Sequence, residues 1–160
     1  MTASQLKRQF YSAFDHSHVC CWLKGQSMPQ GLTYLGAGTH FEVWKYAASP
    51  ISLVYKKADD DFWDPATPNS QHFISALRAL KKSRAPLIPP FEIVEQDDKL
   101  AIVMPFAESV SGTKFRHPLL EECFRELKRH NLAVNDVIQG GECMGEPFIY
   151  DFSDLHFISR

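Results

Sequence analysis

Two closely spaced glycines and a lysine stand on successive apolar stretches in the first third of the sequence. Gly36 and Gly38 lie within "LGAGTHFEVWKY", and Lys56 lies in "ISLVYKK". Glycine lets a backbone approach a phosphate closely, and a lysine on a neighbouring strand supplies balancing positive charge. The arrangement therefore indicates a phosphate-binding site, with a glycine hairpin flanked by solvent-exposed lysines as the alternative interpretation.

Side-chain alternation selects which lysine faces the glycines. If residues 51–57 form a strand, Val54 and Lys56 share one face and Lys57 points to the other. We therefore expect Lys56 to contact phosphate. Val54 and Val43 would form an apolar surface for a flat base on the same side.

The elements that position these residues follow from hydrophobic periodicity and turn residues. Ser4 can cap the first helix, Asn69 or Ser70 can cap the second, and Asn131 is suited to end the third in a left-handed conformation. The segment 135–146 is expected to be a loop that contains a Gly-Gly turn. The periodicity predicts helices at 4–14, 70–82 and 118–130, strands at 32–36, 41–47, 51–57, 91–95 and 99–104, and short strands at 132–134 and 147–152.

Composition excludes several classes of protein. The 160 residues carry a net charge of −2, with 44% hydrophobic and 22% charged residues, which is typical of one soluble globular domain. No long basic run suggests nucleic-acid binding, and no apolar run is long enough to span a membrane. The N-terminus lacks a signal peptide, and the four cysteines fit neither a zinc site nor a disulfide framework. We expect a cytoplasmic protein.

The first half of the sequence resembles the protein-kinase-like fold. "GAGTHFEV" is similar to the glycine-rich loop of that family at Gly36, Gly38 and Val43, although Phe41 replaces the third glycine. "VYK" resembles the lysine motif on the third strand, which ends at Lys56. The family loop covers nucleotide phosphates.

The stretch "LAIVMPFAES" resembles the fifth strand of the family running into the hinge. The resemblance makes Met104 the gatekeeper. It also implies that the Pro105 carbonyl and the Ala107 amide face adenine. Proline lacks an N–H group, but only its carbonyl is needed there.

Two aspartates complete the resemblance. "VND" ends at Asp136 and is similar to a catalytic loop, with Val134 in place of histidine. "YDFSD" is similar to the metal-binding motif and contains Asp151. The resemblance implies ATP and Mg²⁺ as cofactors, with Asp151 holding the metal and Asp136 orienting or deprotonating the acceptor hydroxyl.

The sequence departs from the family in ways that bear on activity. The helix at 70–82 contains no acidic residue to pair with Lys56, and Gln71 can only hydrogen-bond to it. The acidic loop Asp59, Asp60, Asp61 and Asp64 is an alternative source of a carboxylate.

The position of the metal-binding asparagine is also changed. Gly141 stands there, so Glu142 is the substitute metal ligand, with a solvent-exposed Glu142 as the alternative. A second alignment of the catalytic loop places Asn131 at the base position. We favour Asp136, because Asn131 then ends a helix.

The predicted fold class is α+β. The resemblance implies a kinase-like N-lobe, with a five-stranded antiparallel sheet and one helix, followed by a truncated, mostly helical C-lobe. We predict a helical extension over 1–31, an N-lobe over about 32–108 and a C-lobe over about 109–160. Because the sequence ends nine residues after Asp151, we expect an exposed apolar surface on the C-lobe, which a protein partner or second copy would cover.

These features favour a pseudokinase-type regulatory or binding module that retains nucleotide binding. Its nearest relatives by resemblance are small bacterial lipopolysaccharide-kinase-like and PhoP-regulatory-network-type proteins. The alternatives are an active ATP- and Mg²⁺-dependent phosphotransferase acting on a small-molecule or glycan hydroxyl, and a protein-interaction domain that binds no nucleotide.

Other ionisable residues give weaker indications. Asp15, His16 and His18 suggest either a metal site or a solvent-exposed helix end. Cys143 is a candidate reactive thiol, although the spacing places no base beside it.

Overall fold

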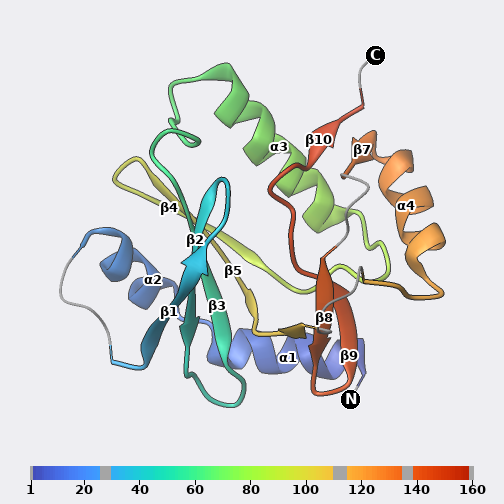
Figure 1. Ribbon diagram of the computed structural model, residues 1–160, viewed down its shortest axis with the longest axis horizontal. Helices are drawn as coiled ribbons and strands as arrows, with labels where there is room; N and C mark the ends of the chain where they lie inside the picture. Colours follow the sequence, from blue (N-terminus) through green and yellow to red (C-terminus); the bar gives the residue numbers. More distant parts are fainter. Residues whose placement is uncertain (1, 26–29, 110–114, 135–138, 159–160) are drawn as a thin grey trace. The chain divides into compact units, whose positions relative to one another are not determined.

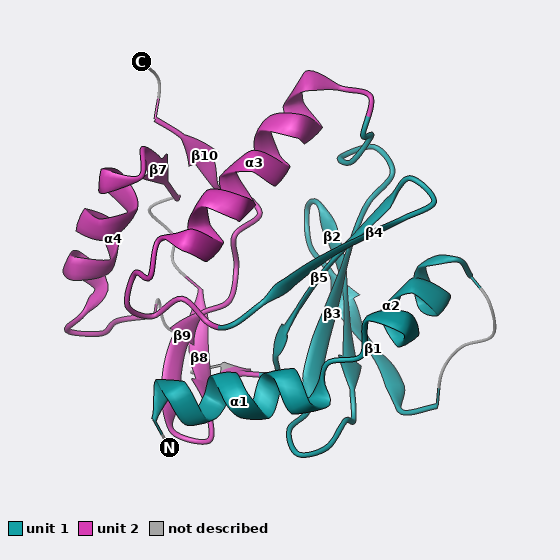
Figure 2. Ribbon diagram, turned by 180° about the vertical axis from the view of Figure 1, so that it is seen from behind, with its two compact units in different colours: residues 1–65, 90–106 teal, residues 66–89, 107–160 magenta. Residues whose placement is uncertain are grey.

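The computed structural model describes residues 2–25, 30–109, 115–134 and 139–158. Its contacts divide the chain into two compact units that interleave along the sequence (Figure 2). Unit 1 contains residues 1–65 and 90–106, and unit 2 contains residues 66–89 and 107–160. The domain limits predicted from the sequence stay a prediction.

A five-stranded antiparallel sheet forms the centre of unit 1 (Figure 1). Its strand order is β1-β2-β3-β5-β4, which places β3 in the middle and leaves β1 and β4 at the edges. The predicted α+β class and five-stranded sheet are confirmed. The strands are β1 (Leu32–Ala37), β2 (Phe41–Tyr46), β3 (Leu53–Ala58), β4 (Glu92–Gln96) and β5 (Lys99–Pro105).

Two helices precede the sheet, where the sequence predicted one helix and a loop. Helix α1 (Ala3–Ala13) is capped by Thr2 rather than Ser4, because Thr2 and Gln5 form a reciprocal capping box. Asp15 caps α2 (His16–Leu23) by accepting a hydrogen bond from the His18 amide. Asp15 is thus a helix cap.

Helix α2 was missed because its formation depends on tertiary packing. Its sequence, HSHVCCWL, contains few strong helix formers. Val19, Trp22 and Leu23 are buried, and the helix contacts β4 and β5. Burial of this apolar face stabilises a short helix that would be marginal alone.

Tyr55 is the residue of β3 that α2 covers. Its side chain is fully buried, and its hydroxyl shares a 2.7 Å hydrogen bond with Nδ1 of His18. The rings of Trp22 and Tyr46 pack against it at centroid distances of 5.3 and 5.5 Å. Burial raises the pKa of Tyr55 well above its usual value, with smaller contributions from Tyr46 and Asp15.

This environment makes stability depend on the charge of His18. Burial lowers the pKa of His18 below 6.5, although the Asp15 carboxylate opposes the shift. Between the lowered pKa and 6.5 the unfolded chain binds more protons, so the free energy of unfolding rises with pH there. The penalty is absent above about pH 6.5 and grows as the pH falls through this window.

We expect His18→Gln to reduce the loss of stability on acidification. Urea unfolding at about pH 7.5 and about pH 5.5 should give a smaller difference for the variant than for the wild type. His130→Gln, which changes an exposed histidine, serves as the control. An equal difference for the wild type and His18→Gln would contradict the prediction.

Unit 2 contains two helices and five short strands among its described residues. Helix α3 contacts β7 and β10, which pair antiparallel, whereas β6, β8 and β9 form a separate sheet. The elements are α3 (Pro68–Lys82), β6 (Glu108–Ser109), α4 (Leu120–Arg129), β7 (Leu132–Ala133), β8 (Gly140–Cys143), β9 (Glu146–Ile149) and β10 (His156–Phe157).

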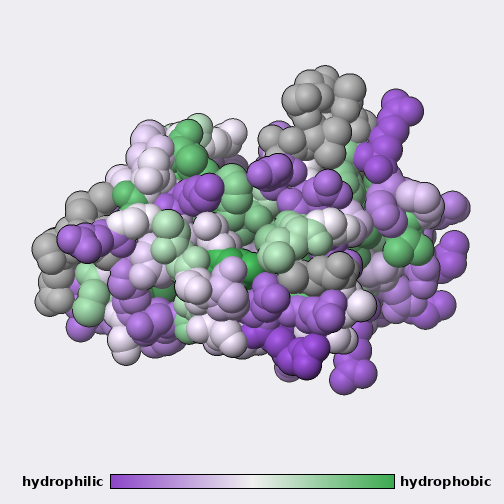
Figure 3. Space-filling view, turned by 90° about the horizontal axis from the view of Figure 1, so that it is seen from below, coloured by the Kyte–Doolittle hydropathy of each residue, from purple (hydrophilic) through white to green (hydrophobic). Residues whose placement is uncertain are grey.

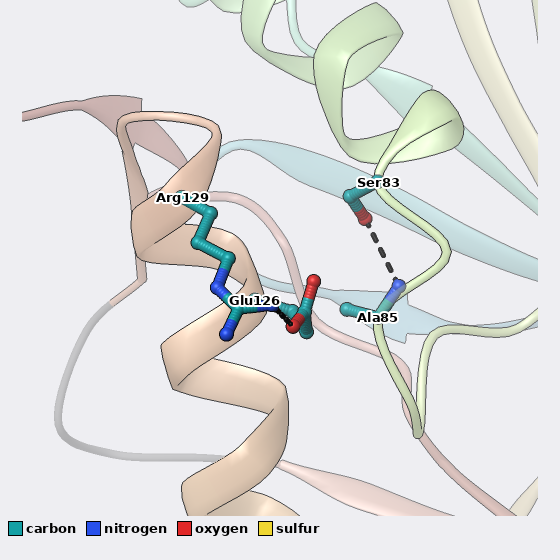
Figure 4. A network of polar contacts seen from close by, with 4 residues as sticks. All are labelled: Ser83, Ala85, Glu126 and Arg129. Carbon is teal, nitrogen blue, oxygen red and sulfur yellow. Dashed lines mark hydrogen bonds and ion pairs between the residues drawn. The ribbon is translucent and has the colours of Figure 1, made fainter.

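The ends of α3 are fixed by side chains that differ from those predicted. Thr67, not Asn69 or Ser70, caps its start by accepting from the Ser70 amide, and Pro68 takes the first helical position. At its end, the Ser83 hydroxyl donates to the Leu80 carbonyl and accepts from the Ala85 amide (Figure 4). The end of α4 is as predicted, because Asn131 adopts a φ of 59°.

Strand β8 lies where the sequence predicted a Gly-Gly turn. Gly140 is buried opposite Ile149. A Cβ atom on Gly140 would lie 2.7 Å from both the Phe115 ring and the Phe148 carbonyl oxygen. Glycine is therefore required here by close packing.

Gly140→Ala should lower the free energy of unfolding by about 1–3 kcal/mol, the usual cost of overpacking. Gly38→Ala is the matched control, because its Cβ would meet nothing closer than 3.9 Å. Urea unfolding should show a change of less than about 1 kcal/mol for the control. Equal losses for the two variants would refute the packing explanation.

Candidate functional site

The predicted nucleotide-binding residues of β2, β3 and β5 lie on one face of the sheet. Cross-strand partners share a face, and the pairing places Val43 opposite Lys56 and Val54 opposite Met104. We call this the Lys56 face; its residues are Val43, Lys45, Val54, Lys56, Ile102 and Met104. The structure thus brings the predicted lysine, the gatekeeper and both valines together.

The opposite face of the sheet is the one that α2 covers. Tyr55 and Lys57 point there, and Lys57 pairs across from Glu42. Because side chains alternate along β3, burial of Tyr55 beneath α2 directs Val54 and Lys56 away from that helix. Lys56 and Lys57 therefore lie on opposite faces of the sheet, as predicted.

A second cation lies on the Lys56 face. Lys45 is opposite Val54, and its Nζ atom lies 4.1 Å from the centroid of the Phe106 ring. This geometry is a cation–π contact, which holds the lysine beside the end of β5. Sequence patterns did not indicate Lys45, because its partner Phe106 is distant along the chain.

The two glycines of the predicted phosphate loop have different roles. Gly36 follows an irregularity in the β1–β2 register and has a φ of 153°, which residues with side chains rarely adopt. The Gly38 amide donates a 2.8 Å hydrogen bond to the Phe41 carbonyl. Gly38 and Phe41 therefore close a tight hairpin around Thr39 and His40, and the Gly38 amide is engaged within it.

The tip of this hairpin is attached to the segment after β3. The Asp59 amide donates a 2.8 Å hydrogen bond to the His40 carbonyl. The His40 and Phe41 rings lie 4.3 and 5.5 Å from the Phe62 ring, centroid to centroid. Phe41, which replaces the third glycine of the family motif, is only 6% exposed and is a core residue.

Phe41→Ala should therefore lower the free energy of unfolding by about 3–5 kcal/mol, as expected for a buried aromatic residue. Leu35→Ala, at a residue that is 49% exposed in the same hairpin, should change it by less than about 0.5 kcal/mol. Chemical denaturation measures both. A loss for Phe41→Ala no larger than that for Leu35→Ala would show that Phe41 is not part of the core.

The predicted hinge residues span the point in the sequence where unit 1 ends and unit 2 resumes. Met104 and Pro105 are buried on β5, and the Phe106 amide donates to the Ser52 carbonyl at 2.9 Å. Because backbone directions alternate along an antiparallel strand, the Pro105 carbonyl points away from β3. Ala107 belongs to unit 2, so the predicted role of its amide stays a prediction.

The acidic loop after β3 provides a partner for another lysine. Asp60 Oδ1 lies 2.6 Å from Lys99 Nζ, and this hydrogen bond lowers the pKa of the Asp60 carboxyl group. Asp60 is therefore engaged by Lys99 at the start of β5. Helix α3 contains no acidic residue that could pair with Lys56. Gln71, which the sequence analysis considered as a hydrogen-bond partner of Lys56, lies on this helix in unit 2.

Asp151 follows β9 and begins a tight turn. Its Oδ1 accepts a 3.0 Å hydrogen bond from the Ser153 amide, and the Leu155 amide donates to the Phe152 carbonyl. Asp136 lies outside the described residues. Because Asp151 belongs to unit 2, its approach to Lys56 stays a prediction.

Asn131 has a structural role within the described part of unit 2. Its amide donates to the Lys128 carbonyl, and its own carbonyl accepts a 2.7 Å hydrogen bond from the Ile158 amide. These bonds and its positive φ make it a helix terminator that also joins the segment after β10. This role agrees with the alignment that leaves Asp136 at the base position.

Glu142 lies on the β8–β9 hairpin that precedes Asp151. It is exposed on β8 and pairs across from Pro147 of β9. Its role as a metal ligand beside Asp151 stays a prediction.

The structure indicates another carboxylate that the sequence analysis missed. Asp154 Oδ2 is buried and has no hydrogen-bond partner among the described residues. Burying such an oxygen is costly unless it binds a proton or a cation. It lies in the same turn as Asp151, and its only signal in the sequence was the second aspartate of "YDFSD". The described residues contain no group of three metal-ligating side chains.

The structure also gives different roles to two other candidate sites, His18 with Asp15 and Cys143. His18 is engaged by Tyr55 and Asp15 caps α2, so these residues serve the fold. Cys143 is buried, and desolvation raises the pKa of its thiol, with a further contribution from Glu108. A thiol with a raised pKa is a poor nucleophile at neutral pH.

No protein-family model matches the sequence, and no curated protein matches it. Among solved structures, that of vaccinia related kinase 3 is similar to this chain, with a TM-score of 0.48 and 11% sequence identity. The likeness covers 96% of this chain and 56% of that chain, so this chain spans little more than half its length. At this level of similarity the match supports no argument about function.

Within residues 2–25, 30–109, 115–134 and 139–158, no helix is both long and apolar enough to cross a bilayer.

Proposed function

We propose that this chain is a degenerate kinase-like protein that binds a nucleotide such as ATP on its Lys56 face and acts as a pseudokinase-type regulatory module. The observation that carries the proposal is the placement of Val43, Val54, Lys56 and Met104 on one face of the sheet. An apolar surface with a central cation suits a flat base joined to phosphates. A cytoplasmic location and a relationship to small bacterial kinase-like proteins are part of the same proposal.

Three features favour regulation over catalysis. The Gly38 amide is engaged by the Phe41 carbonyl, which removes one donor that a phosphate-binding loop would supply. Helix α3 offers no carboxylate for Lys56. Gly141 stands at the position of the metal-binding asparagine of the family motif. A kinase that lacks these parts loses much of the electrostatic stabilisation of phosphoryl transfer.

Asp151 and Asp154 are the residues that would hold Mg²⁺ in this proposal. The buried and unpartnered oxygen of Asp154 fits a cation in the turn that Asp151 begins. Bound there, Mg²⁺ would neutralise phosphate charge. Glu142 is the alternative second carboxylate.

The alternative function is an active phosphotransferase that acts on a small-molecule or glycan hydroxyl. In that case Asp136 would orient or deprotonate the acceptor, while Lys56 holds phosphate. A second alternative is an interaction domain that binds no nucleotide. The three are separated by measuring nucleotide binding first and turnover second.

Thermal unfolding with ATP and Mg²⁺ tests the proposal. A ligand at 100 times its dissociation constant should stabilise the wild type by about 2.7 kcal/mol. Lys56→Ala should abolish this gain, whereas Lys57→Ala, on the opposite face, should retain it. Asp151→Ala and Asp154→Ala should each remove the additional stabilisation that Mg²⁺ provides over ATP alone.

Stabilisation without phosphate turnover on a panel of sugars and glycans supports the pseudokinase. Turnover that Asp136→Ala abolishes would establish the phosphotransferase instead. If ATP stabilises neither the wild type nor Lys57→Ala, both nucleotide-binding functions are excluded and the interaction domain remains.

A further inference from the structure

Unit 2 contains a large groove that the proposed nucleotide site does not use. It has a volume of about 720 Å³ and lies along α4, facing β7 and the segment after β10. Its apolar lining includes Phe115, Leu120, Phe124, Leu132 and Ile158. Such a volume and lining are typical of ligand-binding sites.

Part of this apolar surface is exposed to solvent. Phe124 is 38% exposed and Ile158 is 37% exposed, although both are large hydrophobic residues. On the face shown in Figure 3, apolar side chains are exposed in small groups among hydrophilic ones. Large apolar residues that are exposed along one groove indicate an interaction site.

The charged residues that line the groove are both positive. They are Arg116 and Lys128, and neither has an ion-pair partner among the described residues. The neighbouring Arg129 is different, because it pairs with Glu126 on the same helix (Figure 4). Among the described residues, the groove thus combines an apolar floor with two cations that have no ion-pair partner, and none of its described lining residues is acidic.

The two cations lie at opposite ends of α4. Arg116 precedes the helix and Lys128 lies in its last turn. Between them, Leu120, Phe124 and Leu127 line the groove at helical spacing. The apolar lining of the groove therefore lies between the two cations.

We infer that this groove binds an amphipathic helix of a partner protein, with an apolar stripe flanked by acidic residues. The stripe packs against Phe124 and Leu120, and the acidic residues pair with Arg116 and Lys128. The inference is independent of nucleotide binding, because it depends on unit 2 alone.

A second copy of this chain is a poorer occupant on grounds of charge. Helices α1, α2 and α3 contain no acidic residue, and α1 and α3 both carry lysine and arginine. The remaining helix of the described chain, α4, forms the wall of the groove. Like charges would therefore face Arg116 and Lys128 if α1 or α3 docked there.

Fluorescence anisotropy with two labelled helical peptides tests the inference. Both peptides carry the same leucine stripe at i, i+3, i+4 and i+7, one flanked by glutamate and the other by lysine. The full chain should bind the acidic peptide at least ten-fold more tightly, and added salt should reduce the difference. Phe124→Ala should weaken binding of the acidic peptide about ten-fold.

Charge reversal provides the matched control. Arg116→Glu combined with Lys128→Glu should reverse the preference, so that the basic peptide binds more tightly. Lys82→Glu combined with Arg125→Glu changes the net charge equally at exposed positions that do not line the groove, and should leave the preference unchanged. Thermal unfolding checks that each variant is folded.

Several results would overturn the inference. These are equal binding of the two peptides, an equal effect of the two charge-reversal pairs, and no binding of the acidic peptide at about 100 μM. Sedimentation that shows a dimer of the wild type, dissociated by Phe124→Ala, would assign the groove to a second copy instead.

Discussion

The burial of Tyr55 is the constraint on which the arrangement of unit 1 depends. Tyr55 lies in the middle of the central strand, fully buried, and its hydroxyl shares a hydrogen bond with His18 of α2. A phenol in an apolar core requires such a partner, because an unpaired buried hydroxyl costs free energy. The contact therefore fixes which face of the sheet α2 covers. Strand alternation then directs Val54 and Lys56 to the other face.

The hairpin between β1 and β2 shows how packing engages the groups that a phosphate-binding loop would need. A loop that binds phosphate needs free amides and small residues, whereas this one closes through the Gly38 amide and buries Phe41 against Phe62. The aromatic contacts and the Asp59–His40 hydrogen bond favour a fixed conformation over an open loop. The Gly38 amide therefore donates within the hairpin.

Unit 2 keeps its polar groups in short turns and its apolar surface along α4. Asp151 and Asp154 occupy one turn, and Glu142 lies on the preceding β8–β9 hairpin. The groove beside α4 carries exposed apolar side chains and cations that have no partner within the described chain. These two regions of unit 2 therefore differ in chemistry.

The sequence by itself determined the strands of the main sheet, their faces and the end of α4 at Asn131. These features depend on alternation, helical periodicity and a residue that tolerates positive φ, all of which are local. Only the tertiary structure decided that HSHVCCWL is a helix, that Gly140 is a packing residue and that the Gly38 amide is engaged. Each depends on a partner that local patterns do not specify: β4 and β5 for α2, Phe115 for Gly140, and the closed hairpin for Gly38. Local patterns fix the face on which a residue lies, whereas long-range packing decides what that residue contacts.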